Sequence, residues 1–166
     1  MEAALAELHA DSFKWALACC RRDRPAAEEV LQVAYLKVLD GSARYDERSS
    51  FKTFLFGVIR NTAREHARAQ WLSARRLGGW LTLRPRPEPV PDPESGTLRS
   101  ERARALNEAL TRLSSRQRDV LELVFSHDLT IADAAGVLGI TTGSARQHYE
   151  RGKARLRELL GEGAAR

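Results

Sequence analysis

The 166-residue sequence lacks the features that would place it in a membrane. It has no apolar run long enough to span a bilayer. Its start does not combine positive charge with an apolar signal core. We therefore expect a cytoplasmic protein with no membrane insertion.

Cysteine is scarce, and the two cysteines, Cys19 and Cys20, are adjacent. Neighbouring residues of a helix point in different directions, so a structural disulfide between them is not expected. A metal or redox role, with His9 as a further ligand, is one alternative. The favoured interpretation is that both are small buried hydrophobic residues.

The residues that commonly act in catalysis or bind metals do not form a recognisable catalytic or metal-binding motif. The four histidines are scattered, and no Cys-His spacing typical of a metal site occurs. There is neither a glycine-rich phosphate loop nor a nucleophile motif. We therefore expect a binding protein that is not an enzyme and that has neither a cofactor nor a metal.

Aromatic residues make up only 7% of the chain, and sustained strand-like alternation is absent. With 43% apolar residues the chain can form cores, but two small ones rather than a single large one. Five of the six prolines lie in "RPRPEPVPDPESG", which favours an extended, solvated linker. The prediction is an all-α protein with helical domains at 1–80 and 101–166 and a flexible proline-rich linker at 81–100.

Positive charge is present in excess and is clustered. Lys and Arg number 27 against 22 acidic residues, which gives a net charge of +5 and a pI near 9.7. Seven arginines and one acid lie between Arg60 and Arg86, and five basic residues and one acid lie between Ser144 and Arg157. This distribution predicts two separate basic faces suited to a polyanion.

Helical periodicity predicts three helices in the N-terminal domain. The first runs through "ALAELHADSFKWALACC". The second begins after Pro25, with Glu28 and Glu29 in its first turn, and continues to Gly41. The third, "FKTFLFGVIRNTAREHARAQ", is apolar in its first half and basic in its second. We expect the apolar half to pack and the basic half to bind.

An aromatic residue, Tyr45, lies among cations just before the third helix. The cations are Arg44, Arg48 and Lys52. This mixture suits the stacking of a displaced base and the neutralisation of its backbone. We expect at least two of three nearby aromatic residues in the core: Phe51, Phe54 and Phe56. Asn61 can bond to a base edge or to a helix neighbour, and its chemistry allows both.

The C-terminal part has the pattern of a helix-turn-helix. Leu106, Leu110 and Leu113 recur at helical spacing, and Ser114 or Ser115 can cap the helix that follows them. Thr130 can cap the short helix "IADAAGVLG". Gly139 suits the left-handed residue that ends this short helix, and Thr141 or Thr142 can cap the basic helix that follows. A recognition helix of this kind enters the major groove with its N-terminal residues at the base edges. The alternative is a structural helix-glycine-helix connection with a solvated face, and the small residues Ala134 and Ala135 favour the DNA hypothesis.

In this order, the segments resemble the extracytoplasmic-function (ECF) group of bacterial RNA polymerase sigma factors. "EEVLQVAYLKVL" is similar to the core-binding helix, and "SSFKTFLFGVIRNTA" to the segment that engages the minus-ten promoter element. "LSSRQRDVLELVF" and "LTIADAAGVLGITTGSARQHYERGKARLREL" are similar to the domain for the minus-thirty-five element. The resemblance implies a sigma2-like bundle and a sigma4-like helix-turn-helix domain in a dissociable subunit that directs promoter recognition, melting and initiation. It implies three partners: the clamp region of core RNA polymerase, promoter DNA and an anti-sigma factor.

The resemblance also carries the family's roles to matching positions. Core polymerase binding is implied at Glu29, Gln32, Tyr35, Leu36 and Lys37. Contact with the minus-ten element, including a flipped non-template base, is implied at Arg44, Tyr45, Arg48, Lys52, Arg60, Asn61, Arg64 and Arg68. Contact with the upstream element is implied at Thr142, Ser144, Arg146, Gln147, His148, Arg151 and Lys153. The family more often has Lys-Ser-Arg where this chain has Arg146, Gln147 and His148, and this departure bears on the preferred promoter sequence.

Other functions compete with this one. An autonomous helix-turn-helix regulator would bind a palindromic operator tightly without polymerase. A nucleic-acid-processing enzyme is disfavoured by the missing catalytic groups, and a membrane-surface helix by the small apolar area after Ile140. A separate hypothesis is that some apolar residues near the start of the linker contact a partner or fold back onto a domain: Trp71, Leu72, Leu77, Trp80 and Leu81.

Overall fold

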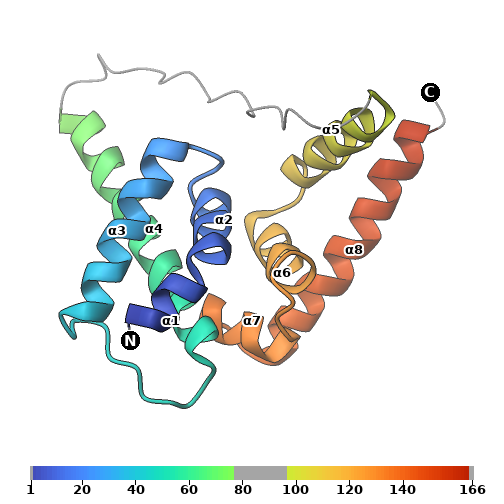
Figure 1. Cartoon of the computed structure of the whole chain (residues 1–166). Coiled ribbons are helices and arrows are strands. Elements are labelled where there is room, and N and C mark those ends of the chain that lie inside the picture. Colours follow the sequence, from blue (N-terminus) through green and yellow to red (C-terminus); the bar gives the residue numbers. More distant parts are fainter. Residues whose placement is uncertain (1, 77–96, 165–166) are drawn as a thin grey trace. The chain divides into compact units, whose positions relative to one another are not determined.

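The computed structural model describes residues 2–76 and 97–164, and these ranges contain eight helices and no strand (Figure 1). The chain divides into two compact units, Met1–Pro89 and Val90–Arg166. Most of the expected linker lies outside the described residues. Its last part is helical, because a helix already begins at Thr97.

The first predicted helix is two helices, α1 (Glu2–Glu7) and α2 (His9–Cys19). The break falls at Leu8, whose backbone has φ −90° and ψ 1°. Hydrogen bonding continues across it, since the amide of Ser12 donates to the carbonyl of Leu8 at 2.8 Å. Backbone hydrogen bonds therefore reach Leu8 from both helices, and apolar spacing alone does not reveal the break.

Helix α3 (Arg24–Leu39) begins earlier than predicted. The carboxylate of Asp23 caps it by accepting a hydrogen bond from the amide of Ala26 at 3.1 Å. Pro25 lies inside the first turn, so Glu28 and Glu29 are in the second turn rather than the first. The prediction that they interact with the start of the helix dipole was therefore wrong, and Glu28 instead pairs with Arg24 at 2.9 Å.

The core of the N-terminal unit centres on Trp15 and Phe56. Their rings stack with centroids 5.9 Å apart, and Trp15 Nε1 donates to the carbonyl of Phe56 at 3.1 Å. Val30 of α3 and Ile59 of α4 (Phe51–Arg76) are also fully buried. Helices α2, α3 and α4 thus pack mutually around one aromatic pair.

Two expectations about α4 need correction. Only Phe56 of the three phenylalanines is fully buried, whereas Phe51 and Phe54 are half-buried. The helix also continues to Arg76, beyond the predicted end at Gln70. Leu77, Trp80 and Leu81, which were predicted to contact a partner or a domain, lie outside the described residues.

Cys19 and Cys20 form no disulfide, and both are half-buried rather than fully in the core. Burial, with a smaller contribution from the charge of Asp23, raises the pKa of the Cys20 thiol to about 11. The reactive thiolate is thereby disfavoured at neutral pH.

The C-terminal unit comprises α5 (Thr97–Thr111), α6 (Ser115–Phe125), α7 (Ile131–Leu138) and α8 (Thr142–Ala164). Its predicted caps are present. Ser114 and Gln117 form a reciprocal capping box at the start of α6, and Thr130 caps α7 through the amide of Asp133 at 3.1 Å. Gly139 is left-handed, with φ 61° and ψ 41°, as predicted. Between Thr141 and Thr142, Thr141 is the cap, since its hydroxyl accepts from the amide of Ser144 at 3.1 Å.

Small residues let the helices of this unit approach closely. Ala134, Ala135 and Ala145 are buried where α7 meets α8. Gly152 faces α6, where an added Cβ would lie 3.0 Å from Leu121 Cδ1. The position of α8 is therefore fixed by contacts that larger side chains would disrupt.

Candidate nucleic-acid and polymerase interfaces

Helix α8 presents its first turns to solvent after the Gly139 turn. Arg146, Gln147 and Arg151 are exposed, while Ala145 between them and α7 is fully buried. Because Ala145 packs inward and an α-helix turns about 100° per residue, Arg146 and Gln147 lie about 100° and 200° from the buried side. Thr142 is also exposed, whereas Ser144 and His148 are half-buried at the edge of this surface.

Lys153, the remaining predicted upstream contact, is held in place by two interactions. Its ammonium lies 4.4 Å from the ring centroid of Tyr149 and 3.3 Å from the carboxylate of Glu150. Tyr149 in turn stacks on Phe125, with centroids 5.8 Å apart, and Phe125 is 61% exposed. This aromatic surface was not predicted, although the aromatic Phe125 at the end of α6, next to polar residues, was a signal for it in the sequence.

The second basic surface lies on α4. Asn61, Arg64 and Arg68 are exposed and recur at intervals of three and four residues, so they share one face. Arg60 does not belong to this face, because it is only 8% exposed. The expectation that Arg60 contacts DNA directly is corrected accordingly: it is one residue out of register with the exposed face and turns toward the core.

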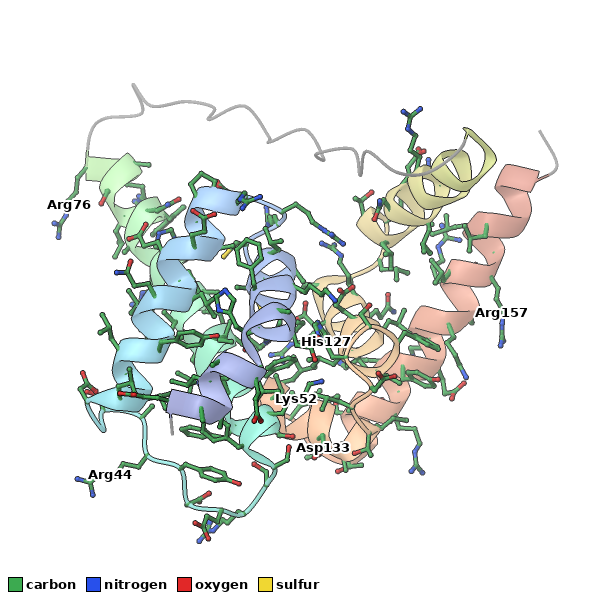
Figure 2. All side chains as sticks on the ribbon, viewed as in Figure 1. Arg44, Lys52, Arg76, His127, Asp133 and Arg157 are labelled. Carbon is green, nitrogen blue, oxygen red and sulfur yellow. The ribbon has the colours of Figure 1, made fainter. Side chains whose placement is uncertain are left out.

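The loop before α4 holds Tyr45 against aromatic neighbours. Its ring lies 5.4 Å from Phe51 and 5.2 Å from Phe54, and its hydroxyl donates to the carbonyl of Ser49 at 2.6 Å. The loop's arginines, Arg44 and Arg48, are exposed, and Figure 2 shows Arg44 pointing away from the helices. The structure thus brings an aromatic ring held by its neighbours together with exposed cations.

Lys52 differs from these loop arginines. Its ammonium pairs with Asp11 of α2 at 2.8 Å and lies 5.6 Å from the ring centroid of Phe56. Lys52 is 25% exposed and Asp11 36% by side chain. Lys52 therefore anchors the start of α4 to α2, a contact that sequence spacing could not predict.

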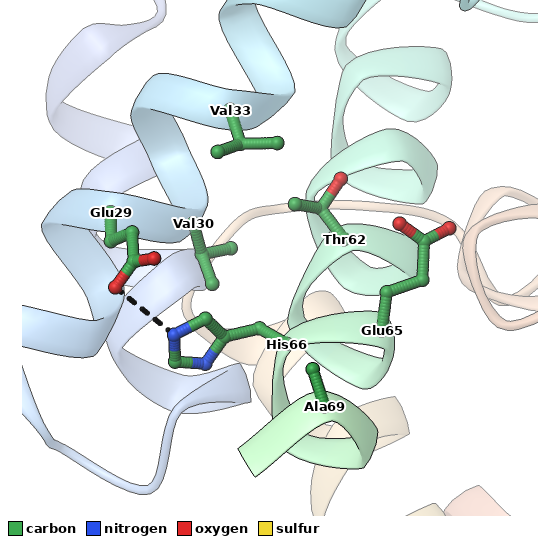
Figure 3. Close-up of a pocket in the computed structure, with 7 residues that line it drawn as sticks. All are labelled: Glu29, Val30, Val33, Thr62, Glu65, His66 and Ala69. Atoms are coloured by element: carbon green, nitrogen blue, oxygen red, sulfur yellow. Dashed lines mark hydrogen bonds and ion pairs between the residues drawn. The ribbon is translucent and has the colours of Figure 1, made fainter. Parts of the chain in front are cut away.

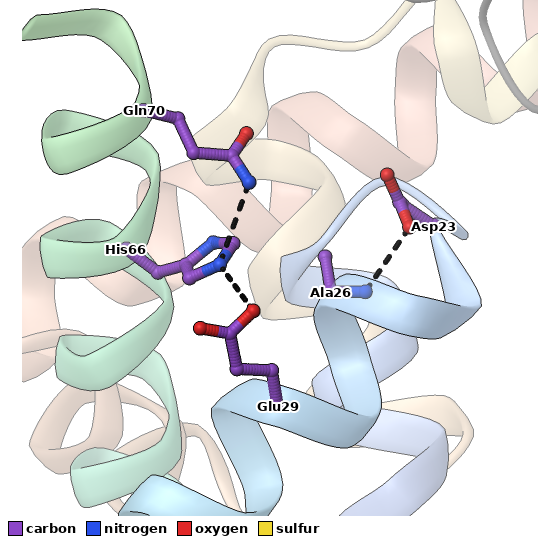
Figure 4. Close-up of polar contacts among 5 residues, drawn as sticks. All are labelled: Asp23, Ala26, Glu29, His66 and Gln70. Atoms are coloured by element: carbon purple, nitrogen blue, oxygen red, sulfur yellow. Dashed lines mark hydrogen bonds and ion pairs between the residues drawn. The ribbon is translucent and has the colours of Figure 1, made fainter. Parts of the chain in front are cut away.

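Helix α3 is joined to α4 by a hydrogen bond and an ion pair that include residues of the predicted polymerase surface. Glu29 bonds to His66 at 3.1 Å, and Gln70 lies 3.4 Å from the same ring nitrogen (Figure 4). Lys37 pairs with Glu65 at 2.5 Å. A pocket of about 230 Å³ lies between α3 and α4 beside the Glu29–His66 contact, and Figure 3 shows its lining residues: Glu29, Val30, Val33, Thr62, Glu65, His66 and Ala69.

The remaining predicted polymerase contacts face outward from α3 or toward α2. Gln32 and Leu36 are exposed, and Leu36 is 55% exposed. Tyr35 lies 3.3 Å from His9 Nδ1, and burial raises the pKa of its phenol while a hydrogen bond with Ser12 lowers it. A second pocket, of about 400 Å³, is lined by His9, Phe13, Arg24, Glu28, Leu31, Gln32 and Tyr35. Phe13, beneath the Arg24 guanidinium, was not predicted as part of this surface.

Comparison with known proteins decides the family. Residues 6–73 match Sigma-70 region 2, and residues 109–158 match Sigma-70 region 4. The RNA polymerase sigma factor CarQ of Myxococcus xanthus is 30% identical over 157 residues, which cover 93% of this chain and 86% of CarQ. The chain belongs to the ECF sigma factors of the sigma-70 family.

Two further relatives agree with this assignment. The ECF RNA polymerase sigma factor SigX of Bacillus subtilis is 29% identical over 147 residues, 85% of this sigma factor and 75% of SigX. In solved structures, the sigma factor RpoE in its complex with the anti-sigma factor NepR from Bartonella quintana has a TM-score of 0.75. It is 22% identical and covers 96% of each chain, which shows that the two share a fold.

Family membership settles the competing functions. This sigma factor is a dissociable subunit of RNA polymerase that directs promoter recognition and transcription initiation, and it is not an enzyme. The presence of both region 2 and region 4 excludes the autonomous helix-turn-helix regulator. Across residues 2–76 and 97–164, no group of three metal-ligating side chains could hold an ion, and no helix is long and apolar enough to cross a membrane.

Proposed function

We propose that the two units of this sigma factor divide promoter recognition, with residues 1–80 for core polymerase and the minus-ten element and residues 101–166 for the upstream element. Residues 81–100 connect them and follow the polymerase surface. The observation that carries this proposal is that each unit has its own exposed basic helix face, on α4 and on α8. The sigma factor acts in the cytoplasm, where it meets polymerase.

In the C-terminal unit, the first turns of α8 enter the major groove. Arg146 and Gln147 are exposed and have the donors and acceptors for bidentate base contacts. Thr142, Ser144, His148 and Arg151 flank them and bond to phosphates or sugars. Lys153, which is fixed by Glu150 and Tyr149, contributes positive charge at the edge of the contact.

In the N-terminal unit, the loop before α4 captures an unstacked base of the minus-ten element. Tyr45 stacks with this base, and its contacts with Phe51 and Phe54 keep the ring in position before DNA arrives. Arg44 and Arg48 neutralise the backbone of the displaced strand. Asn61, Arg64 and Arg68 continue the contact along α4, so that binding energy favours strand separation.

Core polymerase binds the exposed face of α3. Leu36 supplies apolar area, Gln32 and Tyr35 supply hydrogen-bonding groups, and Glu29 and Lys37 supply charges at its edge. Glu29 and Lys37 already contact His66 and Glu65 of α4. The clamp therefore binds them either by replacing these contacts or through the acceptor and donor positions that the contacts leave free.

We further propose that an anti-sigma factor regulates this protein. Support comes from the related fold of RpoE, which was solved bound to the anti-sigma factor NepR. The exposed apolar residues Val33, Leu36 and Leu39 of α3 form a surface that such a protein covers in competition with polymerase.

Transcription in vitro tests the proposal. Core polymerase with and without this protein is supplied with genomic promoter fragments, and start sites are mapped. We expect promoter-specific initiation only when both are present, and weak DNA binding by the sigma factor alone. Tight, specific DNA binding without polymerase, or no association with core, would contradict it.

A further inference from the structure

The second half of α4 extends beyond the core that holds its first half. Ala63 is the final buried residue of this helix, yet the helix continues to Arg76. Residues 67–73 are all exposed. The segment contains Ala67, Ala69 and Ala74, which favour helix without packing. Within the described residues, about two turns of helix therefore extend beyond Ala69, where the pocket between α3 and α4 ends.

One face of this projection continues the DNA-facing surface of α4. Asn61, Arg64, Arg68, Trp71 and Arg75 follow one another at intervals of three, four, three and four residues. Side chains at this spacing lie along one face of a helix, and all five are exposed. The surface for the minus-ten element thus leads without interruption to Trp71 and Arg75, which are not among the residues predicted to contact DNA.

The charge of this face is positive. The only acid of the segment 64–76, Glu65, faces α3, where it pairs with Lys37. The guanidinium of Arg75 lies 4.7 Å from the ring centroid of Trp71, whose exposed fraction is 56%. A cation held over an indole is oriented while its donors stay accessible, which suits the binding of an anion such as phosphate.

We propose that Arg64, Arg68, Trp71 and Arg75 form a stripe that binds the phosphate backbone of duplex DNA immediately upstream of the melted minus-ten segment. This inference rests on the proposed function of α4. The helix begins at the base-capturing loop, and its other end leads along the chain to the unit that binds the upstream element, so the stripe runs upstream. From Arg64 to Arg75 it spans about 16 Å, or about five base pairs of duplex.

The matched pair Arg75→Gln and Arg76→Gln tests the stripe. Both remove one positive charge from the same turn, but Arg76 lies off the stripe and points away from the unit (Figure 2). The binding of holoenzyme to a labelled promoter is measured as a function of salt. A second promoter carries uncharged methylphosphonates in the five base pairs upstream of the minus-ten element. Trp71→Ala, which keeps a good helix former, is measured alongside.

We expect Arg75→Gln to weaken binding to the native promoter about eightfold near 0.1 M salt, and to reduce the salt-dependence slope by about one. Arg76→Gln should change binding less than about twofold, because a charge off the stripe contributes only screened attraction. On the methylphosphonate promoter, Arg75→Gln should behave as wild type. Trp71→Ala should weaken binding in the same direction, since Arg75 loses its support.

Equal losses from Arg75→Gln and Arg76→Gln would overturn the stripe, as would a loss that persists on the methylphosphonate promoter. Unchanged DNA binding with weakened binding to core polymerase or to an anti-sigma factor would show a protein surface instead, and would also overturn it. Failure of the proposed function can be told apart from failure of the stripe. If wild-type holoenzyme opens the promoter but Arg75→Gln loses nothing, only the stripe is wrong, whereas failure of wild type to open any promoter removes both.

Discussion

Helices α4 and α8 both present arginines to solvent, but they are supported differently along their lengths. On α8, Ala145, Gly152 and Leu159 are buried at intervals of seven residues, so contact with the rest of its unit continues nearly to the end of the helix. On α4, burial stops at Ala63. Packing along nearly its whole length lets α8 hold its side chains at set positions, as recognition of a base sequence requires. The second half of α4, which lacks this support, is better suited to contacts with the repeating phosphate backbone of DNA.

The largest effect should come from the core that supports the first half of α4. Phe56→Ala removes a buried ring that stacks on Trp15, and we expect the free energy of unfolding of the N-terminal unit to fall by about 3–5 kcal/mol. Urea denaturation followed by tryptophan fluorescence measures this, because all three tryptophans lie in that unit. The control is Phe125→Ala, whose unfolding is followed by far-ultraviolet circular dichroism because the C-terminal unit contains no tryptophan, and loss of the exposed Phe125 ring should cost less than about 1.5 kcal/mol. Similar losses from both variants would contradict the core assignment.

The continuous support of α8 is tested at Gly152. Gly152→Val places atoms where Leu121 Cδ1 and Gln117 Cβ already lie, and should destabilise the C-terminal unit by about 1–3 kcal/mol. Gly161→Ala is the control on the same helix: nothing lies within 4 Å of its added Cβ, so it should stabilise by about 0.5–1 kcal/mol. Thermal unfolding followed by circular dichroism measures both changes. A neutral Gly152→Val would show that α8 is not held at this point.

Sequence recognition should depend on the first turns of α8. Arg146→Ala and Gln147→Ala should each reduce discrimination between the preferred promoter and one with a changed upstream element by about 1–3 kcal/mol. Arg157→Ala, an exposed arginine further along the same helix, should leave discrimination unchanged. Competition binding with holoenzyme provides the measurement, and affinity for core polymerase should stay constant throughout. If Arg157→Ala altered discrimination as much as Arg146→Ala, the recognition surface would be misplaced.

The smallest effect concerns the contact between α3 and α4. Glu65→Gln breaks the ion pair with Lys37, and because Glu65 is 67% exposed the loss of stability should be below about 1 kcal/mol. Lys37 is freed, so binding to core polymerase should not weaken, whereas Lys37→Ala should weaken it. Calorimetry with core polymerase separates the two variants. Equal weakening would mean that the pair is needed for the shape of α3 rather than for direct contact.

Local chemistry made much of the C-terminal unit predictable. Ser114, Thr130, Thr141 and Gly139 act on backbone groups within three or four residues, so their roles depend on little beyond their neighbours. The helix-turn-helix and its exposed Arg146 and Gln147 follow from such signals.

The N-terminal unit was less predictable because its details depend on how separate helices meet. Arg60 and Asn61 are adjacent in sequence, and only the packing of α4 on its neighbours decides that the first is buried and the second exposed. The pairing of Lys52 with Asp11 joins residues 41 positions apart. The α4 extension past Gln70 was missed because its residues have no apolar periodicity, and none of its residues up to Arg76 is buried.

The uninterrupted helical path from Ile59 through Ala63 to Arg75 has a consequence for how this protein can vary in length. Because the phase of the first half is set by burial, one residue inserted after Ala63 would rotate everything beyond it by about 100° and turn Trp71 and Arg75 away from their face. An insertion of seven residues would nearly preserve the phase and lengthen the helix by about 10 Å. Relatives that keep the same use of this helix should therefore differ here only by insertions that nearly preserve the phase, such as about seven or eleven residues.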